Sequence, residues 1–268
     1  MSTAVCVPIK YPAGEWLHLF LREVERFKDV SRFIFSYGYP KEDPEGEDPT
    51  LIKLKSWIKT TKHKVEVYEE PKLEVISGTP QLAAIYHDFQ KLVDPEKESH
   101  VLLIDSDLVK IPHDLIQLLK KQNKDIIAPY PWVKNHVPPL FYDSMIFRVN
   151  GKRFHPLLPP TSKETMKVDS VGTCFLVRSK IFKEIPYRNP YTAMPFCNDA
   201  RAKGYGVWAD PRIKVWHLDI TRLGISHRPL FPDETPLVTE SGAEFTPREA
   251  GGHLYRAYVE GRIPREVH

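Results

Sequence analysis

Two aspartates directly after an apolar run are the residues in this chain best suited to chemistry. Val101-Leu-Leu-Ile104 is followed by Asp105, Ser106 and Asp107. Such a run predicts a strand buried on both faces of a sheet, and side chains just beyond it emerge at the carboxyl edge, where open α/β sheets bind ligands. Carboxylates there favour Mg²⁺ or Mn²⁺ together with a phosphorylated substrate. An aspartate after a strand can equally cap the next helix, so the pair alone leaves both interpretations open.

A histidine follows a later apolar run in the same way. Ile213-Lys-Val-Trp216 predicts a strand that runs into His217, with Asp219 two residues beyond it. A neutral imidazole beside two carboxylates makes a mixed nitrogen and oxygen site, which suits Mn²⁺ better than Ca²⁺. His217 could instead be a hydrogen-bonded core histidine, and Asp219 could hold its second ring nitrogen or simply begin a loop.

Strands and helices alternate over the first 130 residues, and these elements must position the candidate ligands. The hydrophobic periodicity predicts strands at 4–9, 32–37, 64–68, 101–105 and 125–128, and helices at 15–27, 50–61, 80–92 and 112–121. This order predicts a mostly parallel sheet with right-handed crossovers.

The pattern changes after Tyr130. Proline-rich turns bracket an apolar and aromatic segment, residues 140–149, which reads as one or two strands turning at Asn150-Gly151. Further elements are predicted as strands at 168–177 and 213–216 and helices at 178–185, 196–205 and 251–258. Gly204 is well placed as a left-handed helix cap, and apolar periodicity fades from Arg222 onward.

The composition excludes several classes of protein. A chain of 268 residues fits one enzyme-sized domain, and 38 basic residues mixed with 35 acidic ones give a net charge of only +3, so nucleic acid is not expected as a partner. Cys6, Cys174 and Cys197 lie far apart among apolar residues, which suits reduced thiols. There is no apolar run near the roughly 20 residues of a membrane span and no signal-peptide pattern at 1–10, so we expect a cytoplasmic protein without a transmembrane segment.

Four motifs occur in the order and approximate spacing seen in glycosyltransferases of the GT-A fold, and the chain resembles the family 2-like branch most. The motifs are Ile104-Asp-Ser-Asp107, Val168-Asp-Ser-Val-Gly-Thr-Cys-Phe-Leu-Val-Arg178, Phe196-Cys197 with Gly204-Tyr205, and Asp210-Pro211 with His217. The resemblance covers residues from about 4 to 220. It implies an α/β fold with a Rossmann-like, mostly parallel central sheet flanked by helices, and a small antiparallel portion in the C-terminal half.

The resemblance implies a metal-dependent glycosyltransferase of hexosyltransferase type. Its donor would be a UDP-sugar or GDP-sugar, its acceptor a hydroxyl of a glycan, small molecule or protein, and its metal Mn²⁺ or Mg²⁺. By the same resemblance Asp107 is the main metal ligand, Asp105 lies beside it, and His217 completes the site. The chemistry agrees, because a cation stabilises the negative charge that develops on a departing diphosphate.

Other residues are assigned to the nucleotide and donor sugar through the resemblance. Those expected to meet the nucleotide or its phosphates are Pro8, Lys10, Tyr11, Glu69 or Glu70, Asp105, Ser106, and, if the tail folds back, His227 and Arg228. Trp132, Trp208 and Trp216 could stack on a sugar or base, or could pack in the core.

The catalytic base is where the sequence departs from the family. Inverting members usually carry a Glu-Asp pair at the position that Thr192-Ala193 occupies here. Either Asp169 or Asp199 substitutes as the base, or the enzyme retains configuration and the leaving phosphate takes the proton. Asp169 could also bind sugar hydroxyls or be a turn aspartate that accepts backbone amides, and Asp199 could be a solvated helix residue.

We expect residues 1–222 to form the GT-A catalytic domain, with a nucleotide-binding half (1–130) and a donor sugar and acceptor half (131–222). Residues 223–268 would be a C-terminal extension that serves as a lid, an acceptor platform or a contact in a homo-oligomer. Two other functions stay open. A nucleotide-sugar binding protein without turnover would explain the missing Glu-Asp pair, whereas a sugar nucleotidyltransferase would need a basic, glycine-rich loop that Pro8-Ile-Lys-Tyr-Pro12 lacks.

Overall fold

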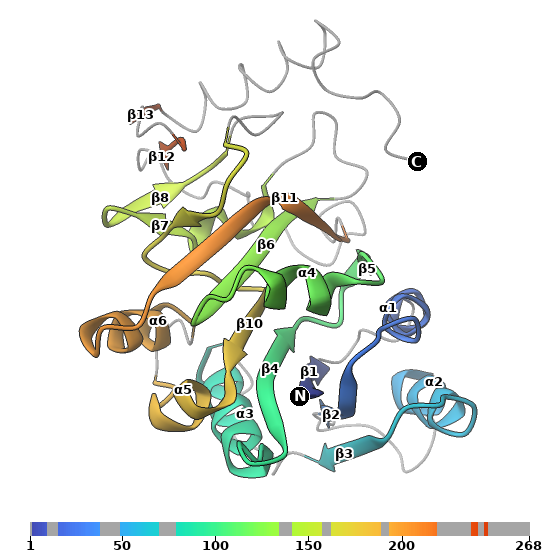
Figure 1. The fold of residues 1–268 in the computed structure, drawn as a ribbon. Coiled ribbons are helices and arrows are strands. Elements are labelled where there is room, and N and C mark those ends of the chain that lie inside the picture. The colour runs from blue at the N-terminus through green and yellow to red at the C-terminus, as the bar shows by residue number, and fades with distance from the viewer. Residues whose placement is uncertain are drawn as a thin grey trace, which may run out of the picture.

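The protein has a large central β-sheet with helices on both faces and a small second sheet beside it (Figure 1). The computed structural model describes residues 2–9, 16–37, 49–69, 79–133, 141–156, 162–188, 193–218, 237–240 and 244–245. The mixed α/β architecture and the mostly parallel sheet predicted from the sequence are confirmed.

The strands of the large sheet follow the order β3-β2-β1-β4-β10-β6-β11-β5, with β9 paired to β11. Their bounds are β1 Ser2–Ile9, β2 Val30–Tyr37, β3 Val65–Glu69, β4 Glu98–Ile104, β5 Leu108–Lys110, β6 Ile126–Val133, β9 Met166–Lys167, β10 Cys174–Arg178 and β11 Val207–His217. Strands β1 to β4 are parallel, as are β6 and β11, while β10 runs antiparallel between β4 and β6. The carboxyl ends of the parallel strands therefore meet at one edge, around β4 and β11.

Helices on the two faces enclose two separate hydrophobic cores. The helices α1 Leu17–Val24, α2 Pro49–Ile58 and α4 Leu115–Lys121 pack on one core, and α3 Thr79–Leu92, α5 Ser179–Glu184 and α6 Ala193–Ala202 on the other. Strand β1 contributes side chains to both cores: Val5 and Val7 enter one core, and Ala4 and Cys6 enter the other. This alternation is the period-2 geometry of a strand buried on both faces.

The small sheet contains a tight hairpin. Its order is β13-β12-β8-β7, formed by β7 Arg148–Val149, β8 Lys152–Phe154, β12 Leu237–Val238 and β13 Glu244–Phe245. Asn150 and Gly151 join β7 to β8 with φ values of 52° and 76°, the left-handed backbone that a two-residue hairpin requires. The turn predicted at these two residues is confirmed.

Two predicted elements were wrong in part. In the described part of the segment predicted at 140–149, a short 3-10 helix, η2 Tyr142–Met145, precedes β7, because the Asp143 carbonyl accepts the amides of Ile146 and Phe147. The strand predicted at 168–177 begins only at Cys174, because the segment before it instead pairs locally with Arg148. The last predicted strand is longer than expected and begins at Val207. The helix predicted at 251–258 lies outside the described residues.

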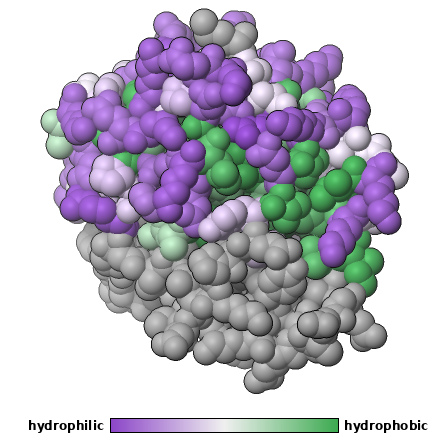
Figure 2. Space-filling view, turned by 90° about the horizontal axis from the view of Figure 1, so that it is seen from below, coloured by the Kyte–Doolittle hydropathy of each residue, from purple (hydrophilic) through white to green (hydrophobic). Residues whose placement is uncertain are grey.

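Apolar burial is extensive in the described part of the chain. The large hydrophobic side chains that are well exposed there are Ile52, Val67 and Leu92. In the coloured part of Figure 2 hydrophilic residues predominate, and apolar residues reach the surface at its middle and right. None of the described helices combines the length and the apolar character needed to span a membrane.

Candidate active site

Backbone pairing brings the Asp-x-Asp segment and the strand-terminal histidine to the same edge of the sheet. β4 ends at Ile104, and the chain turns through Asp105 to Asp107 into β5, which pairs with β11 so that Leu108 lies opposite His217. The amide of Leu218 donates to the carbonyl of Asp107 at 2.9 Å. These two parts of the sequence, 110 residues apart, are therefore held side by side by the sheet itself.

Asp107 and His217 face each other through two acceptor atoms. Asp107 Oδ1 lies 2.9 Å from His217 Nε2, and both atoms are buried without a hydrogen bond. His217 Nδ1 lies 2.7 Å from the Leu218 carbonyl, which only accepts, so Nδ1 carries the ring proton and Nε2 presents a lone pair in the neutral ring. Two lone pairs at this separation need a proton or a cation between them.

The electrostatics of this pair depend on its burial and mutual attraction. Burial opposes charging of the His217 ring, but the facing Asp107 carboxylate outweighs it and raises the pKa of His217. Burial likewise acts to raise the pKa of Asp107, yet the charge of His217 prevails and lowers it. Burial, followed by repulsion from Asp107 and Asp143, raises the pKa of Asp105 well above its ordinary value. The edge therefore concentrates negative charge, which favours a bound cation.

Asp143 is a third carboxylate of this edge that the sequence did not reveal. It lies on η2, its Oδ1 accepts the Thr173 hydroxyl at 2.7 Å, and its buried Oδ2 has no hydrogen bond. A Cβ at Gly172 would stand only 3.0 Å from that Oδ2, so glycine is needed there for close approach. Burial above all raises the pKa of Asp143 to about 6.

Tyr142, next to Asp143, covers the face of His217. The two rings are stacked with centroids 3.5 Å apart and planes 13° apart. The ring of His217 is thus fixed by Tyr142 on its face and by the Leu218 carbonyl at Nδ1. A fixed ring keeps Nε2 directed at Asp107, the role that outer residues commonly play around a metal-binding histidine.

The residues present fit a divalent cation whose remaining ligands come from substrate and water. Within the described residues no group of three His, Cys, Asp or Glu side chains forms a complete metal site. Mg²⁺ sites of phosphate-transferring enzymes usually have only one or two protein carboxylates, with phosphates and waters filling the other positions. The orphaned oxygen of Asp107 and nitrogen of His217 match such a partial protein shell.

The two candidate bases both lie in ion pairs with arginines. Asp169 Oδ1 lies 2.8 Å from a terminal nitrogen of Arg201, and its Oδ2 accepts the amide of Gly151 at 2.6 Å. Asp199 accepts from Arg188 with both oxygens, at 2.5 and 2.6 Å. The hydrogen bond to Gly151 is the turn chemistry considered for Asp169 as an alternative.

The other predicted residues are placed as follows. Pro8 is buried in β1 opposite Ser36, Glu69 ends β3 opposite Tyr37, and Ser106 is buried between the two aspartates. The residues that lie outside the described parts of the chain are Lys10, Tyr11, Glu70, Asp219, His227 and Arg228.

The three tryptophans considered for stacking, Trp132, Trp208 and Trp216, make packing contacts. Trp132 is fully buried, and Trp216 packs on the same core. Trp208 packs on the other core and lies under the ammonium of Lys124, 3.7 Å from the ring centroid. Their contacts agree with the core interpretation.

The fold can now be compared with known proteins. No protein-family model and no curated protein matches this chain by sequence. Among solved structures it is similar to GalNAc-T7 with UDP, GalNAc and Mn²⁺, with a TM-score of 0.60 and 14% identity over 81% of this chain and 44% of that one. It is also similar to a mannosyltransferase, PcManGT from Pyrobaculum calidifontis, in complex with GDP-Man and Mn²⁺ (TM-score 0.54, 13% identity, 80% of this chain and 56% of that one).

A third similar structure is S. aureus TarS 1-349, with a TM-score of 0.52 and 14% identity over 81% of this chain and 60% of that one. The chain thus spans between 44% and 60% of the length of these three structures. These structures are GT-A glycosyltransferases. At this level of identity the similarity shows the fold, and the GT-A fold predicted from the sequence is confirmed.

Proposed function

We propose that this chain is a metal-dependent glycosyltransferase that moves a sugar from a nucleoside diphosphate sugar to a hydroxyl acceptor. The observation that carries the proposal is the pair of buried, unsatisfied atoms, Asp107 Oδ1 and His217 Nε2, 2.9 Å apart at the carboxyl edge of a GT-A sheet. Two of the similar structures contain a uridine or guanosine nucleotide together with Mn²⁺, which supports the same chemistry here.

In this proposal Asp107 and His217 hold Mn²⁺ or Mg²⁺, and Asp105 and Ser106 lie beside the ribose or diphosphate. The bound cation supplies charge neutralisation for the departing diphosphate. The chain's own contribution is orientation, because Tyr142 and the Leu218 carbonyl fix the imidazole before any ligand arrives. We assign nucleotide binding to residues 1–130 and the donor sugar and acceptor to residues 131–222.

The ion pairs of Asp169 and Asp199 bear on the path of the acceptor proton. Both carboxylates already accept hydrogen bonds from arginines, which leaves them less free to approach an acceptor hydroxyl. This favours a course in which the acceptor oxygen bonds to the sugar, the sugar–diphosphate bond breaks, and the proton passes to the departing diphosphate. Such a course retains the configuration of the sugar.

A nucleotide-sugar binding protein without turnover is the second candidate. It is favoured by one observation: the position of the expected second carboxylate is Ala193, which is buried at the start of α6. The first position of that pair, Thr192, lies outside the described residues. A nucleotidyltransferase has no comparable support, because the sequence lacks its glycine-rich basic loop.

The test is to incubate the protein with Mn²⁺ and a panel of UDP- and GDP-sugars and to measure release of the nucleoside diphosphate. We expect one donor to be consumed, and Asp107→Asn and His217→Gln to abolish its consumption. Asp94→Asn, which alters an exposed ion pair with Lys97 before the start of β4, is the control variant and should not change it. Metal-dependent binding of a donor with no turnover would favour the binding protein, and no binding of any donor would contradict both functions.

A further inference from the structure

One buried acceptor atom of the candidate active site still lacks a role. Asp143 is only 4% exposed, and its Oδ2 has no hydrogen bond, whereas its Oδ1 accepts the Thr173 hydroxyl at 2.7 Å. A carboxylate oxygen that has lost its water and gained no donor destabilises the folded protein. A donor that arrives with a ligand is therefore the explanation that this atom requires.

Asp143 lies next to the candidate metal ligands without being one of them. Its neighbour Tyr142 stacks on the His217 ring. Burial first, and then repulsion from Asp107 and Asp143, raises the pKa of Asp105, so the three carboxylates share one electrostatic environment. The described residues nevertheless contain no group of three His, Cys, Asp or Glu side chains that could hold a metal ion, so Asp143 does not complete a cation site with Asp107 and His217. The missing partner of Oδ2 is therefore a hydrogen-bond donor.

The carboxylate of Asp143 is fixed before any ligand binds. The Thr173 hydroxyl gives its proton to Oδ1, and a Cβ at Gly172 would stand 3.0 Å from Oδ2, so the oxygen fits there only because residue 172 is glycine. A fixed acceptor in a dry site discriminates strongly between ligands. It binds a hydroxyl well, and an analogue without that hydroxyl leaves the acceptor unpaired.

The surroundings of Asp143 bring a ligand of this site toward it. Asp143 lies deeper than its neighbours in the site, which are partly exposed and can contact a ligand directly. A ligand held by those neighbours would have its innermost group against Oδ2. The partly exposed neighbours are Asp105, Asp107, Tyr142 and Thr173.

The charge of Asp143 determines which part of a nucleotide sugar can lie against it. Phosphate oxygens are anionic and have no proton to donate, so a carboxylate repels the diphosphate. Sugar hydroxyls are neutral, and each donates one proton. Asp143 also belongs to residues 131–222, to which the proposed function assigns the donor sugar and the acceptor. A hydroxyl of the sugar is the donor that fits both the charge and the position.

We propose that Asp143 is a specificity-determining residue that binds one hydroxyl of the donor sugar, with that O–H donating to Oδ2. The proposal rests on the proposed function for the identity of the ligand, but binding requires no turnover. It predicts that the protein prefers a donor with a free hydroxyl at one ring position to the corresponding deoxy sugar.

Calorimetric binding in the presence of Mn²⁺ tests this role. The probes are UDP-glucose, UDP-galactose, UDP-N-acetylglucosamine and GDP-mannose, their monodeoxy analogues, and UDP and GDP alone. We expect one nucleotide sugar to bind the unmodified protein at least about tenfold more tightly than one of its deoxy analogues, because its hydroxyl bonds a charged group. Asp143→Asn should reduce this ratio to less than about threefold, because the amide keeps the Thr173 bond but replaces the Oδ2 acceptor with a donor. UDP or GDP alone should bind the variant no more weakly.

Two further variants separate this role from a general effect of the substitution. Thr173→Val keeps the shape of the side chain but removes the hydroxyl that orients Asp143, and it should reduce the ratio several-fold. Asp94→Asn removes an exposed carboxylate charge before β4 and should leave the ratio unchanged.

The proposal is overturned if the ratio survives in Asp143→Asn or if no deoxy analogue binds more weakly than its parent. It is also overturned if Asp143→Asn weakens UDP or GDP alone as much as the nucleotide sugar, because the bonded group would then belong to the nucleotide. Release of nucleoside diphosphate by the unmodified protein reports on the proposed function separately. Its absence with an intact hydroxyl preference refutes the transferase alone, and its presence without that preference refutes the role of Asp143 alone. No binding of any probe contradicts both.

Discussion

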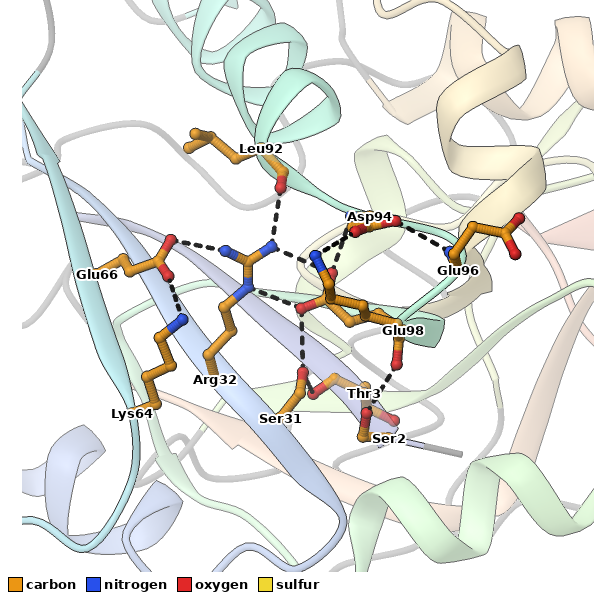
Figure 3. A network of polar contacts seen from close by, with 11 residues as sticks. Ser2, Thr3, Ser31, Arg32, Lys64, Glu66, Leu92, Asp94, Glu96 and Glu98 are labelled. Atoms are coloured by element: carbon orange, nitrogen blue, oxygen red, sulfur yellow. Dashed lines mark hydrogen bonds and ion pairs between the residues drawn. The ribbon is translucent and has the colours of Figure 1, made fainter.

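The two edges of the central sheet differ in whether their buried charged groups have partners within the chain. At the amino edge the Arg32 guanidinium donates to Glu98 at 2.7 and 3.2 Å, to Glu66 at 2.7 Å and to the Leu92 carbonyl at 2.8 Å (Figure 3). Glu98 also accepts from the Ser31 hydroxyl and the Asp94 amide. Hydrogen bonding to these carboxylates raises the pKa of Arg32, so its charge is fully matched.

At the carboxyl edge the same sheet gathers three acceptor atoms that lack a donor when the His217 ring is neutral. Asp107 Oδ1, His217 Nε2 and Asp143 Oδ2 are buried and have no hydrogen bond. Buried polar atoms are almost always paired in native proteins, and each exception needs an explanation. This difference indicates that the charged groups of the amino edge are paired within the chain and stabilise the fold. The acceptor atoms of the carboxyl edge lack partners, as those of a binding site do before its ligand binds.

The largest expected effect comes from removing one acceptor of the carboxyl edge. Asp107→Asn should lower turnover of the donor at least about 10³-fold, because a cation contributes several kcal/mol of transition-state stabilisation and each 1.4 kcal/mol is tenfold. The free energy of unfolding should fall far less than the activity, because relief of the repulsion with Asp105 offsets part of the lost attraction between Asp107 and His217. Donor hydrolysis and urea denaturation measure the two quantities. Full activity in this variant, or a loss of stability that matches the loss of activity, would contradict the comparison.

The same kind of change at the amino edge should have the reverse outcome. Glu98→Gln leaves Arg32 without its main counter-charge, and breaking a largely buried pair costs about 3–5 kcal/mol of unfolding free energy. Urea denaturation should show this loss, while the activity of the remaining folded protein stays close to normal. Lys97→Gln, which breaks an exposed pair nearby, is the control and should cost less than about 1 kcal/mol. Equal stability of the two variants would refute a structural role for this edge.

The pH dependence of stability should also separate the edges. The pKa of Asp143 is raised from 3.8 to about 6, so between these values the folded state keeps a proton that the unfolded state has lost. Stability of the metal-free protein should therefore fall by roughly 2–3 kcal/mol as the pH rises from 4 to 6. Burial acts to raise the pKa of Glu66, but hydrogen bonds and charge attraction from Arg32 and Lys64 outweigh it and lower the pKa. The contribution of Glu66 to stability is therefore lost as the pH falls.

Denaturation curves with EDTA at several pH values, on the unmodified protein and on Asp143→Asn, measure this effect. The variant should show a smaller decline between pH 4 and 6, because Asp105, whose pKa is also raised, still contributes to it. A decline of the same size in both proteins would show that another group is responsible.

The smallest expected effects come from two glycines that differ in their surroundings. Gly172→Ala would place a methyl group 3.0 Å from Asp143 Oδ2 and 3.1 Å from Ile146, so we expect a loss of about 1–2 kcal/mol and a several-fold loss of activity. Gly204→Ala meets open space but must adopt φ near 91°, which costs about 1 kcal/mol without an effect on activity. Denaturation and donor hydrolysis together distinguish them, and an inactive Gly204→Ala would contradict the assignment.

The sequence predicted the parts of the site that follow regular strands. The apolar runs before Asp105 and His217 identify β4 and the end of β11, and parallel strand order places both at one edge. The alternation predicts a mostly parallel sheet, and the family resemblance carried by the four motifs implies the GT-A fold. The assigned roles of Asp105, Asp107 and His217 stay predictions until they are tested.

Residues on irregular segments could not be predicted from local pattern. Asp143 lies among aromatic and apolar residues whose spacing imitates a strand, and its place in the site depends on the Thr173 hydroxyl 30 residues away. The pairing of Asp169 with Arg201 likewise depends on the register between β7 and the segment that precedes β10. Neither contact leaves a periodic signal, because both are set by tertiary packing.

The central claim is tested most directly by measuring Mn²⁺ binding in the presence of UDP or GDP. Electron paramagnetic resonance quantifies the free ion. The account predicts one site per chain whose affinity falls about 100-fold or more in both Asp107→Asn and His217→Gln and is unchanged in Glu66→Gln at the opposite edge. Unchanged Mn²⁺ affinity in the Asp107 and His217 variants would contradict it.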